Sequence, residues 1–374
     1  MSEVFNVNNK LGFGLMRLPE SEDKVIDLEQ VCQMVDKFIE KGGTYFDTAY
    51  VYHEGNSEKI VKKALVERYP RESFTLATKL PAWEMKTIDD VERIFNEQLE
   101  RTGAGYFDYY LLHAIEKKHA VVYDKYDCYK WALEKKAQGL IKHVGFSFHD
   151  DAEFLDEILK KYPEMEFVQL QINYLDWEDS HVQSRACYEV SVKHSIPVIV
   201  MEPVKGGTLA QLPEKAAAIL KAKNADVSMA SWAMRFCGTL DNVKMILSGM
   251  SNMEQVEDNL KTMVDFKPLS EEEKEAVSAA TEAYLSYPTV QCTTCRYCEP
   301  GCPVTIKIPD MIRSLNTTKL YGVNEQAVTM HDNFAKEGNL ASACVECGQC
   351  ESVCPQHLNI MEILKEISDV FEEK

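Results

Sequence analysis

Two runs of four cysteines near the C-terminus constrain this chain more than any other feature. Both runs have the spacing C-x2-C-x2-C-x3-C followed by proline: Cys292, Cys295, Cys298, Cys302 and Pro303, then Cys344, Cys347, Cys350, Cys354 and Pro355. Two-residue gaps let a tight turn bring three thiolates to one metal cluster, so a fourth ligand must come from elsewhere in the chain. The sequence therefore predicts two [4Fe-4S] clusters.

This spacing resembles the ligand run of bacterial two-cluster ferredoxins, in which each run gives its fourth cysteine to the other cluster. The resemblance implies one cluster on Cys292, Cys295, Cys298 and Cys354. It implies a second cluster on Cys344, Cys347, Cys350 and Cys302. The alternatives are structural zinc sites or disulfides. Zinc sites usually pair C-x2-C with a distant second pair, which fits four cysteines within eleven residues less well.

Composition limits the compartment and the partners. The other cysteines (Cys32, Cys128, Cys187 and Cys237) are scattered, and because Met1–Lys10 is polar we expect no secretory leader. No apolar run is long enough to cross a bilayer, so no membrane association is expected. We therefore expect a cytoplasmic protein, in a compartment where thiols stay reduced. A net charge of −19 argues against nucleic acid and is compatible with a basic redox partner protein.

From Phe13 to about Met263, short apolar runs alternate with amphipathic segments. The expected strands are Phe13–Leu18, Tyr45–Ala49, Phe74–Leu80, Tyr109–His113, His143–Phe148, Phe167–Tyr174, Pro197–Glu202 and Lys244–Ser248. The expected helices are Leu28–Lys41, Ser57–Glu67, Asp89–Arg101, Tyr126–Gly139, Asp151–Tyr162, Val182–His194, Ser228–Phe236 and Glu254–Val264. Eight such units predict a (β/α)8 TIM barrel. The alternative is an open doubly wound sheet, but the third glycine of G-x-G-x-x-G is missing after Gly12 and Gly14.

The C-terminal part is expected to be mainly helical. A helix from Glu271 to Leu285 ends before Tyr287-Pro288, which places the predicted boundary between a barrel domain, 1–287, and a cluster domain, 288–374. The 41 residues between the two cysteine runs exceed what a compact ferredoxin needs. Helices are expected at Ile308–Leu315, Val323–Phe334, Asn339–Cys344 and Ile360–Phe371. The domain resembles the α-helical two-cluster modules of anaerobic reductases.

Several polar motifs follow the predicted strands, at the barrel face where catalysis occurs. They are Phe46-Asp47-Thr48-Ala49 with Tyr52, Glu58, Ala77-Thr78-Lys79, Leu111-Leu112-His113, Gly145-Phe146-Ser147, and Gly249-Met250-Ser251 with Gln255 and Asn259. This combination resembles the aldo-keto reductase superfamily, in the branch that carries a C-terminal two-[4Fe-4S] ferredoxin-like domain. The resemblance implies an NAD(P)-dependent oxidoreductase.

The resemblance assigns a catalytic tetrad of Asp47, Tyr52, Lys79 and His113, and the chemistry supports these residue types. Hydride reduction of a carbonyl places negative charge on its oxygen, so a proton donor is needed. A free tyrosine has a pKa of about 10, which a nearby ammonium lowers. Lys79 would supply that ammonium, Asp47 would hold it, and His113 would orient the carbonyl. Each residue alone has an ordinary structural explanation; their order on strands two to four favours catalysis.

The resemblance also implies a nicotinamide dinucleotide at the barrel mouth. Its expected contacts are Ser147, Gln169, Met201, Pro203, Val204, Gly206, Gly249, Ser251, Gln255 and Asn259. Many relatives have an aromatic residue after strand seven and an Asn after the strand-five serine, whereas this chain has Met201-Glu202-Pro203 and Phe148-His149. Residues 249–260 contain no Lys or Arg, so NADP is only slightly preferred over NAD, with Lys205 as an alternative phosphate partner.

Two hypotheses for the whole chain result. The first is an oxidoreductase that reduces a small carbonyl compound, or oxidises the alcohol, with clusters that transfer electrons or stabilise the fold. The alternative is an iron–sulfur electron-transfer protein whose barrel is a docking or nicotinamide-sensing scaffold. Hydride transfer moves two electrons together and no flavin motif is present to divide them. Trp83, Trp177 and the 113–125 loop would line the substrate pocket or pack beneath loops; the substrate itself is not identified.

Overall fold

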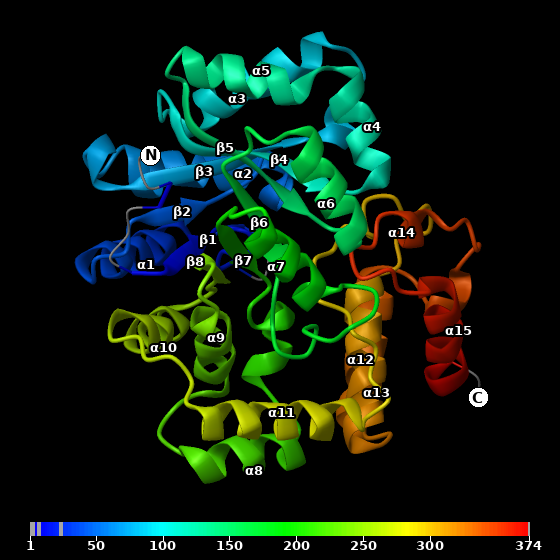
Figure 1. Cartoon of the computed structure of the whole chain (residues 1–374). Helices are drawn as coiled ribbons and strands as arrows, with labels where there is room; N and C mark the ends of the chain where they lie inside the picture. Colours follow the sequence, from blue (N-terminus) through cyan, green and yellow to red (C-terminus); the bar gives the residue numbers. More distant parts are fainter. Residues whose placement is uncertain (1–3, 6–8, 22–24, 373–374) are drawn as a thin grey trace. The chain divides into compact units, whose positions relative to one another are not determined.

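The computed structural model describes residues 4–5, 9–21 and 25–372, so the polar segment Met1–Lys10 lies partly outside the described residues. Within these ranges, eight parallel strands form one closed barrel in the order β1 to β8 (Figure 1). The strands are β1 Leu11–Gly14, β2 Tyr45–Asp47, β3 Thr75–Pro81, β4 Phe107–Ile115, β5 Ile141–Phe148, β6 Phe167–Gln171, β7 Val198–Met201 and β8 Val243–Gly249. The (β/α)8 prediction is confirmed.

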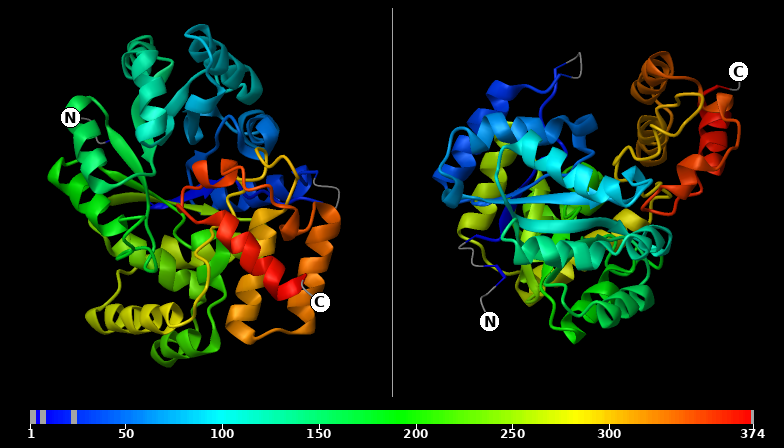
Figure 2. Two further views of the ribbon diagram at one scale, coloured as in Figure 1. Left: turned by 90° about the vertical axis from the view of Figure 1, so that its right-hand side faces the viewer. Right: turned by 90° about the horizontal axis from the view of Figure 1, so that it is seen from above.

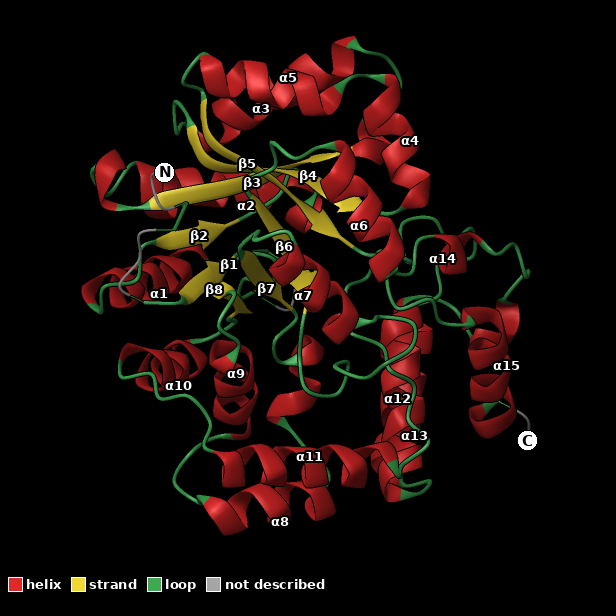
Figure 3. Ribbon diagram, viewed as in Figure 1, coloured by secondary structure: helices red, strands yellow, loops and turns green. Residues whose placement is uncertain are grey.

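Helices surround these strands (Figure 3). They are α1 Leu28–Glu40, α2 Asn56–Val61, α3 Asp89–Thr102, α4 Lys117–Lys125, α5 Cys128–Ala137, α6 Ala152–Lys161, α7 Ser184–Lys193, α9 Met229–Thr239 and α10 Met253–Val264, with shorter turns η1 Tyr52–Gly55, η2 Lys62–Val66, η3 Arg71–Ser73 and η4 Ala82–Glu84. N-cap side chains satisfy backbone amides in the first turn of some of these helices. At α6, for example, the Asp151 carboxylate accepts a hydrogen bond from the Phe154 amide at 2.8 Å. None of the described helices is long and apolar enough to cross a membrane.

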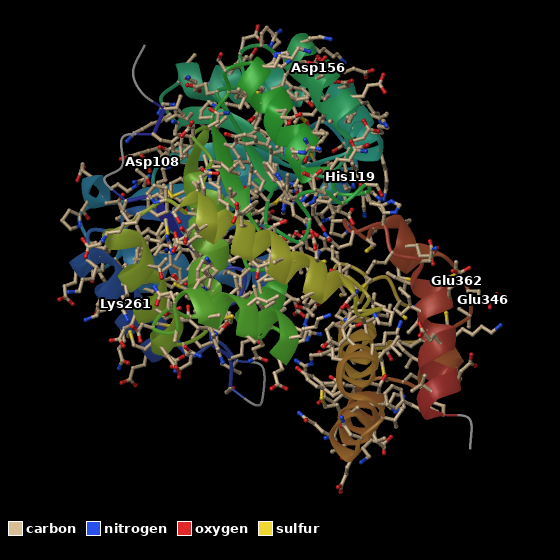
Figure 4. The ribbon with its side chains drawn as sticks, turned by 60° about the horizontal axis from the view of Figure 1, so that its bottom comes forward. Asp108, His119, Asp156, Lys261, Glu346 and Glu362 are labelled. Carbon is tan, nitrogen blue, oxygen red and sulfur yellow. The ribbon has the colours of Figure 1, made fainter. Side chains whose placement is uncertain are left out.

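Aromatic packing fills the barrel interior. Phe5 stacks on Tyr109 with ring centroids 5.0 Å apart and meets Phe167 edge-on at 5.8 Å. The Tyr109 hydroxyl donates to the Val4 carbonyl at 2.8 Å, which ties the N-terminal segment to this core. The barrel interior is therefore a solid core, and its chemistry must lie at the strand ends. Figure 4 labels one residue near each end of β4: Asp108 at the start of the strand and His119 beyond its end.

Contacts divide the chain into two compact units: Met1–Pro203 with Ala230–Ser270, and Val204–Met229 with Glu271–Lys374. The second unit contains η5 Lys205–Ala210, α8 Glu214–Lys223, α11 Glu271–Leu285, α12 Ile308–Tyr321, α13 Glu325–Glu337, η6 Ala341–Ala343, α14 Gln349–Ser352 and α15 Ile360–Phe371. Helices α12 and α13 run beside each other in two views (Figures 1 and 2). The domain limits 1–287 and 288–374 remain a prediction, and these units group residues differently.

The two cysteine runs share a pattern of left-handed φ angles at an offset of 52 residues, although only the second contains a short helix, α14. Left-handed φ angles occur at Thr294 (53°) and Glu346 (52°), directly before the second cysteine of each run. They recur directly after it, at Arg296 (65°) and Gly348 (71°). Each run then leads into a long helix, because α12 begins at Ile308 and α15 at the equivalent position, Ile360. The second unit therefore contains an internal repeat, which the cysteine spacing alone only hinted at.

Some element predictions were incomplete. Asn339–Cys344 contains only the short turn η6 rather than a helix, since Leu340 takes an extended conformation. The 113–125 loop contains helix α4, and the segment after β7 contains helix α8, neither of which was predicted. Helix α4 has a weak apolar periodicity with only Ala120 and Tyr123 buried, so pattern reasoning had little signal there.

Candidate functional site

The side chains of β2, β3 and β4 meet in a buried cluster. Lys79 Nζ donates to Asp47 Oδ1 at 2.5 Å and to the Thr48 carbonyl at 2.7 Å. The same ammonium lies 4.8 Å from the centroid of the Tyr52 ring. The His113 ring stands edge-on to Tyr52, with centroids 6.0 Å apart. The structure therefore brings together all four residues that the sequence singled out as a tetrad.

The barrel register explains this convergence. Asp47 pairs with Ala77 across β2 and β3, two residues before Lys79, and Pro81 pairs with His113 across β3 and β4. Tyr52 comes from the turn after β2, where His53 has a left-handed φ of 50°. That turn is held by the loop after β1, because the Leu18 amide donates to His53 Nε2 at 3.2 Å. Tyr52 is thereby held over the strand ends instead of facing solvent.

Burial dominates the electrostatics of this cluster. Burial lowers the pKa of Lys79 and raises the pKa of Asp47, while the attraction between the two charges opposes both shifts. Burial also lowers the pKa of His113 well below 6.5, and the Lys79 ammonium adds to this effect. The site therefore combines a charged pair with a neutral imidazole, a combination suited to polarising an oxygen without adding a second cation.

A second layer holds Lys79, and most of it escaped the sequence reasoning. Glu58 is fully buried and accepts hydrogen bonds from Thr78 Oγ1 at 2.7 Å and from Gln98 Nε2 at 3.0 Å. Gln98 Nε2 also lies 3.0 Å from the Lys79 carbonyl, and Gln98 Oε1 accepts from the Tyr110 hydroxyl at 2.7 Å. Gln98 lies on α3, where polar residues are common on exposed faces, so the sequence carried no signal for its role.

His113 gives the barrel a pH dependence whose sign follows from burial. The unfolded chain binds a proton on histidine near pH 6.5, whereas the folded pKa of His113 lies well below that. Because the unfolded state binds more protons, the free energy of unfolding falls as the pH drops below 6.5. His113→Gln should remove about 1.4 kcal/mol of this loss at pH 5.5. Urea unfolding at pH 7.5 and 5.5 measures this drop in the free energy of unfolding, and His181→Gln, at an exposed histidine, is the control. The same drop in the parent protein and in both variants would contradict the prediction.

Two expected carboxamide contacts lie on neighbouring strands. Ser147 pairs with Gln169 across β5 and β6, and both side chains are at most 2 % exposed. The Ser147 oxygen accepts from the Ala114 amide at 2.7 Å, which leaves the hydroxyl proton to donate elsewhere. Among the described residues, Gln169 Oε1 is a buried oxygen without a hydrogen-bond donor. One donor and one acceptor side by side match the two ends of a primary carboxamide.

The end of β8 adds a cation that the sequence reasoning missed. Ser251 Oγ donates to the Arg17 carbonyl at 2.8 Å, and a Cβ at Gly249 would lie 3.1 Å from the Arg17 side chain. The Arg17 guanidinium also pairs with Glu202 at 3.4 Å. The Ser251 amide donates to Gln255 at 2.7 Å. Arg17 lies far from Ser251 in sequence, so only the closed barrel, which pairs β1 with β8, brings them together.

The remaining expected contacts are divided between the units. Asn259 Nδ2 donates to Ser248 Oγ at 2.7 Å and supports the end of β8 from below. Met201 ends β7 and Pro203 follows it in the first unit, whereas Val204 and Gly206 belong to the second. Lys205 is only 1 % exposed, so its ammonium is poorly suited to the phosphate role that the sequence offered.

The two tryptophans have different surroundings. Trp83 is 39 % exposed, and its ring lies 5.1 Å from both His113 and His119. Trp177 packs edge-on against Phe236 at 5.5 Å and against Tyr188 at 5.7 Å. Trp83 therefore borders the tetrad, and Trp177 is a packing residue between loop and helix.

The described cysteines of the second unit form no disulfide, and their thiols gather in two groups. One pocket is lined by Cys302, Cys344, Cys347 and Cys350, with apolar neighbours that include Ile306 and Leu364. Burial raises the pKa of Cys298, and the nearby thiols of Cys295, Cys292 and Cys354 raise it further. Each group thus combines three cysteines of one run with the fourth cysteine of the other.

The number and kind of these donors match a [4Fe-4S] cubane. No three described His, Cys, Asp or Glu side chains converge closely enough to hold one metal ion. A [4Fe-4S] cubane instead needs four thiolates spread around it, one for each iron. The two runs also pack closely against each other, since a Cβ at Gly301 would lie 2.7 Å from the Gln349 side chain. Free thiols spread around a pocket fit the cluster.

Comparison with known proteins agrees with both halves of this description. The family model described as "Aldo/keto reductase family" matches residues 10–282, and the "4Fe-4S dicluster domain" matches residues 291–359. A Bacillus subtilis relative, "Uncharacterized oxidoreductase YqkF", is 24% identical over 307 residues and covers 73% of this chain and 93% of its own. The "NADH-specific methylglyoxal reductase" of Escherichia coli is 27% identical over 209 residues, which cover 48% of this chain and 58% of the relative.

Solved structures resemble the fold. The holo form of the aldo-keto reductase AKR11C1 from Bacillus halodurans superposes with a TM-score of 0.57 at 24% identity, covering 72% of this chain and 91% of its own. An aldo-keto reductase from Klebsiella pneumoniae in complex with NADPH gives a TM-score of 0.57 at 20% identity, covering 74% and 90%. At these identities the likeness establishes the barrel architecture.

Proposed function

The chain belongs to the aldo/keto reductase family, a family of oxidoreductases, and we propose that its barrel reduces the carbonyl group of a small molecule with NAD(P)H or catalyses the reverse oxidation of an alcohol. The observation that carries the proposal is the position of the Lys79 ammonium, 2.5 Å from Asp47 and 4.8 Å from the Tyr52 ring centroid. A scaffold with no chemistry has no need to bury such a pair beside a tyrosine, since burying charges is unfavourable unless they are used or fully paired.

Each tetrad residue has one role in the proposed reaction. A nicotinamide held by Ser147 and Gln169 would supply the hydride for the carbonyl carbon. The Tyr52 hydroxyl gives its proton to the carbonyl oxygen, and Lys79 favours the tyrosinate that remains. Asp47 keeps Lys79 in place. His113, neutral because burial lowers its pKa, orients the carbonyl by hydrogen bonding.

The residues around the tetrad fit a nicotinamide dinucleotide. The unpaired Gln169 oxygen and the Ser147 hydroxyl would hold the carboxamide amine and oxygen. Ser251, Gln255 and Asn259, with Gly249, would lie along the adenosine half, and Arg17 beside Ser251 would neutralise a phosphate. Met201, Pro203, Val204 and Gly206 would follow the pyrophosphate. Lys205 is buried and poorly placed to bind a 2′-phosphate, so the slight preference for NADP over NAD rests on Arg17 instead.

For the second unit we propose two [4Fe-4S] clusters with exchanged fourth ligands. Cys292, Cys295, Cys298 and Cys354 would hold one cluster, and Cys344, Cys347, Cys350 and Cys302 the other. The two groupings of thiols support this assignment. Such clusters supply one-electron chemistry, for which a redox partner protein would be the source or acceptor.

The decisive experiment is anaerobic purification with iron and sulfide assays, followed by NADPH and NADH oxidation against a panel of aldehydes. Carbonyl-dependent oxidation of either nucleotide is the expected result, with about eight iron atoms per chain. A chain that holds its iron and binds nucleotide but turns over no carbonyl compound would instead favour the electron-transfer or sensing alternative.

Hydride chemistry should be separable from the clusters. Every tetrad residue precedes residue 114 and every cluster ligand follows residue 291, and no electron relay is needed between nicotinamide and carbonyl. We expect kcat for a model aldehyde to survive partial loss of iron in air, while thermal stability falls. Turnover at saturating nucleotide and cluster absorbance are measured together during controlled exposure. If activity disappears in step with cluster absorbance while circular dichroism stays unchanged, the clusters carry electrons in turnover.

A further inference from the structure

Inside the second unit, the loop after β7 packs directly on the first cysteine run. Gly206 has a φ of 62°, and a Cβ at this residue would lie 2.1 Å from the carbonyl oxygen of Thr293. Thr293 follows Cys292 and is 2 % exposed, and Lys205 and Leu209 beside Gly206 are buried as well. The loop and the cysteine run therefore fit together at the level of their backbones, with room at residue 206 for glycine alone.

The second cysteine run provides an internal comparison. Val345 occupies the position equivalent to Thr293, 52 residues later, and the two runs share left-handed φ angles on either side of their second cysteines. Val345 is nevertheless 59 % exposed, against 2 % for Thr293. The loop after β7 meets the first run at Thr293 and so contributes to this difference in exposure.

This loop has a backbone that depends on outside support. Lys205, Gly206 and Gly207 have consecutive positive φ angles of 46°, 62° and 99°. A non-glycine residue in the left-handed region is disfavoured, so Lys205 stays there only if its surroundings hold it. Within the turn, the amides of Gly207 and Leu209 both donate to the Val204 carbonyl at 3.1 Å. The Thr293 carbonyl is a backbone support from outside the turn.

We propose that the contact between Thr293 and Gly206 couples the first iron–sulfur cluster to dinucleotide binding. This inference rests on the proposed function, which assigns Val204 and Gly206 to the pyrophosphate. Four thiolates bound to one cluster fix the run around Thr293, and Thr293 in turn fixes the loop that meets the phosphates. Loss of the cluster frees the run and weakens nucleotide binding, while the tetrad, which lies in the barrel strands, keeps its kcat.

Coupling between two binding events is reciprocal, so it is tested from both sides. The first arm needs no nucleotide and compares Gly206→Ala with Gly207→Ala. A Cβ at Gly206 meets the Thr293 carbonyl, whereas a Cβ at Gly207 meets nothing within 4 Å, although its φ of 99° makes alanine at least as strained there. Gly207→Ala is therefore a control for strain in the loop without the contact.

In this arm, the proteins are exposed briefly to air, alkylated with iodoacetamide and digested, and mass spectrometry counts labelled cysteines in each run. In Gly206→Ala we expect Cys292, Cys295 and Cys298 to be labelled roughly two- to thirtyfold faster than in the parent protein. This range corresponds to the effects that single mutations usually have on coupling between sites. Cys354, the fourth ligand proposed for this cluster, should react faster with them. Cys344, Cys347, Cys350 and Cys302, which would hold the other cluster, should react at the parent rate, and Gly207→Ala should resemble the parent. Equal labelling of the two sets of ligands in Gly206→Ala, or equal effects of the two substitutions, would overturn the proposal.

The second arm adds saturating NADPH to the parent protein and measures NADPH affinity, KM and kcat as iron is lost. Bound NADPH should slow labelling of the first cluster's ligands alone, and loss of that cluster should raise KM for NADPH with kcat changed less than about twofold. NADPH that binds without protecting the first run refutes the coupling. A protein that binds no NADPH at all refutes the proposed function, and the first arm still reports whether the contact stabilises the cluster.

Discussion

Tyr52→Phe is expected to lower kcat for aldehyde reduction by roughly 10²–10⁴-fold, because a positioned proton donor contributes about that much to the rate. The substitution removes one hydroxyl and leaves the ring beside Lys79 and His113, so NADPH affinity should stay within about twofold. Steady-state kinetics with a model aldehyde and a fluorescence titration of NADPH measure the two quantities separately.

The matched control is Tyr50→Phe, two residues earlier in the same loop. The Tyr50 hydroxyl donates to Glu97 at 2.6 Å, outside the tetrad, so its loss tests whether disturbing this loop is enough to slow turnover. We expect Tyr50→Phe to retain near-parent kcat. Turnover in Tyr52→Phe that matches the Tyr50→Phe control would move the proton donor to another residue.

Cys354→Ala should remove about half of the bound iron, and the lost cluster should be that of the first run. The reason is that Cys354 acts on the pKa of Cys298, while Cys302 lines the pocket of Cys344, Cys347 and Cys350. Iron analysis with differential alkylation of the two runs measures the outcome: Cys292, Cys295 and Cys298 should become reactive and the second run should stay protected.

Cys187→Ala is the control for loss of a thiol, since Cys187 is buried in α7 of the barrel and far from both runs in sequence. It should keep the full iron content. If Cys354→Ala instead exposes Cys344, Cys347 and Cys350, each run holds its own cluster, and the exchanged assignment is wrong.

Much of the barrel was predictable because its signals are local. Apolar runs such as Phe107–Ile115 and Ile141–Phe148 recur with helical segments between them. A parallel strand that is buried on both faces is a nearly continuous apolar run, so its composition alone indicates a strand of this kind. The tetrad positions were accessible from local motifs, since Asp47, Lys79 and His113 lie at or near the ends of β2, β3 and β4 and Tyr52 lies in the turn after β2. Helix α4 was missed because its pattern is weak, and the first strand ends at Gly14, earlier than expected, because the chain turns at Leu15 and Met16.

Contacts between distant segments could not be predicted in this way. Gln98 supports Lys79 from α3, Arg17 reaches Ser251 only because β1 pairs with β8, and Gly206 is covered by Thr293. None of these pairs has a fixed spacing in sequence. Their meeting depends on closing the barrel and on the packing of the loop after β7 against the second unit's own helices and cysteine loops.

The sequence by itself determined the residue types and their local order: cysteine spacing that turns three thiolates inward, eight strand-and-helix units, and a tyrosine, lysine, aspartate and histidine after neighbouring strands. Those features depend on separations of a few residues, where backbone geometry is set by the chain itself. Only the tertiary structure decided that Gln169 keeps an unpaired buried oxygen, that Lys205 is buried, and that Thr293 is covered while Val345 is exposed. Burial is a property of the packed molecule, because two cysteine runs with the same spacing and the same left-handed positions differ in exposure according to the distant segments that pack on them.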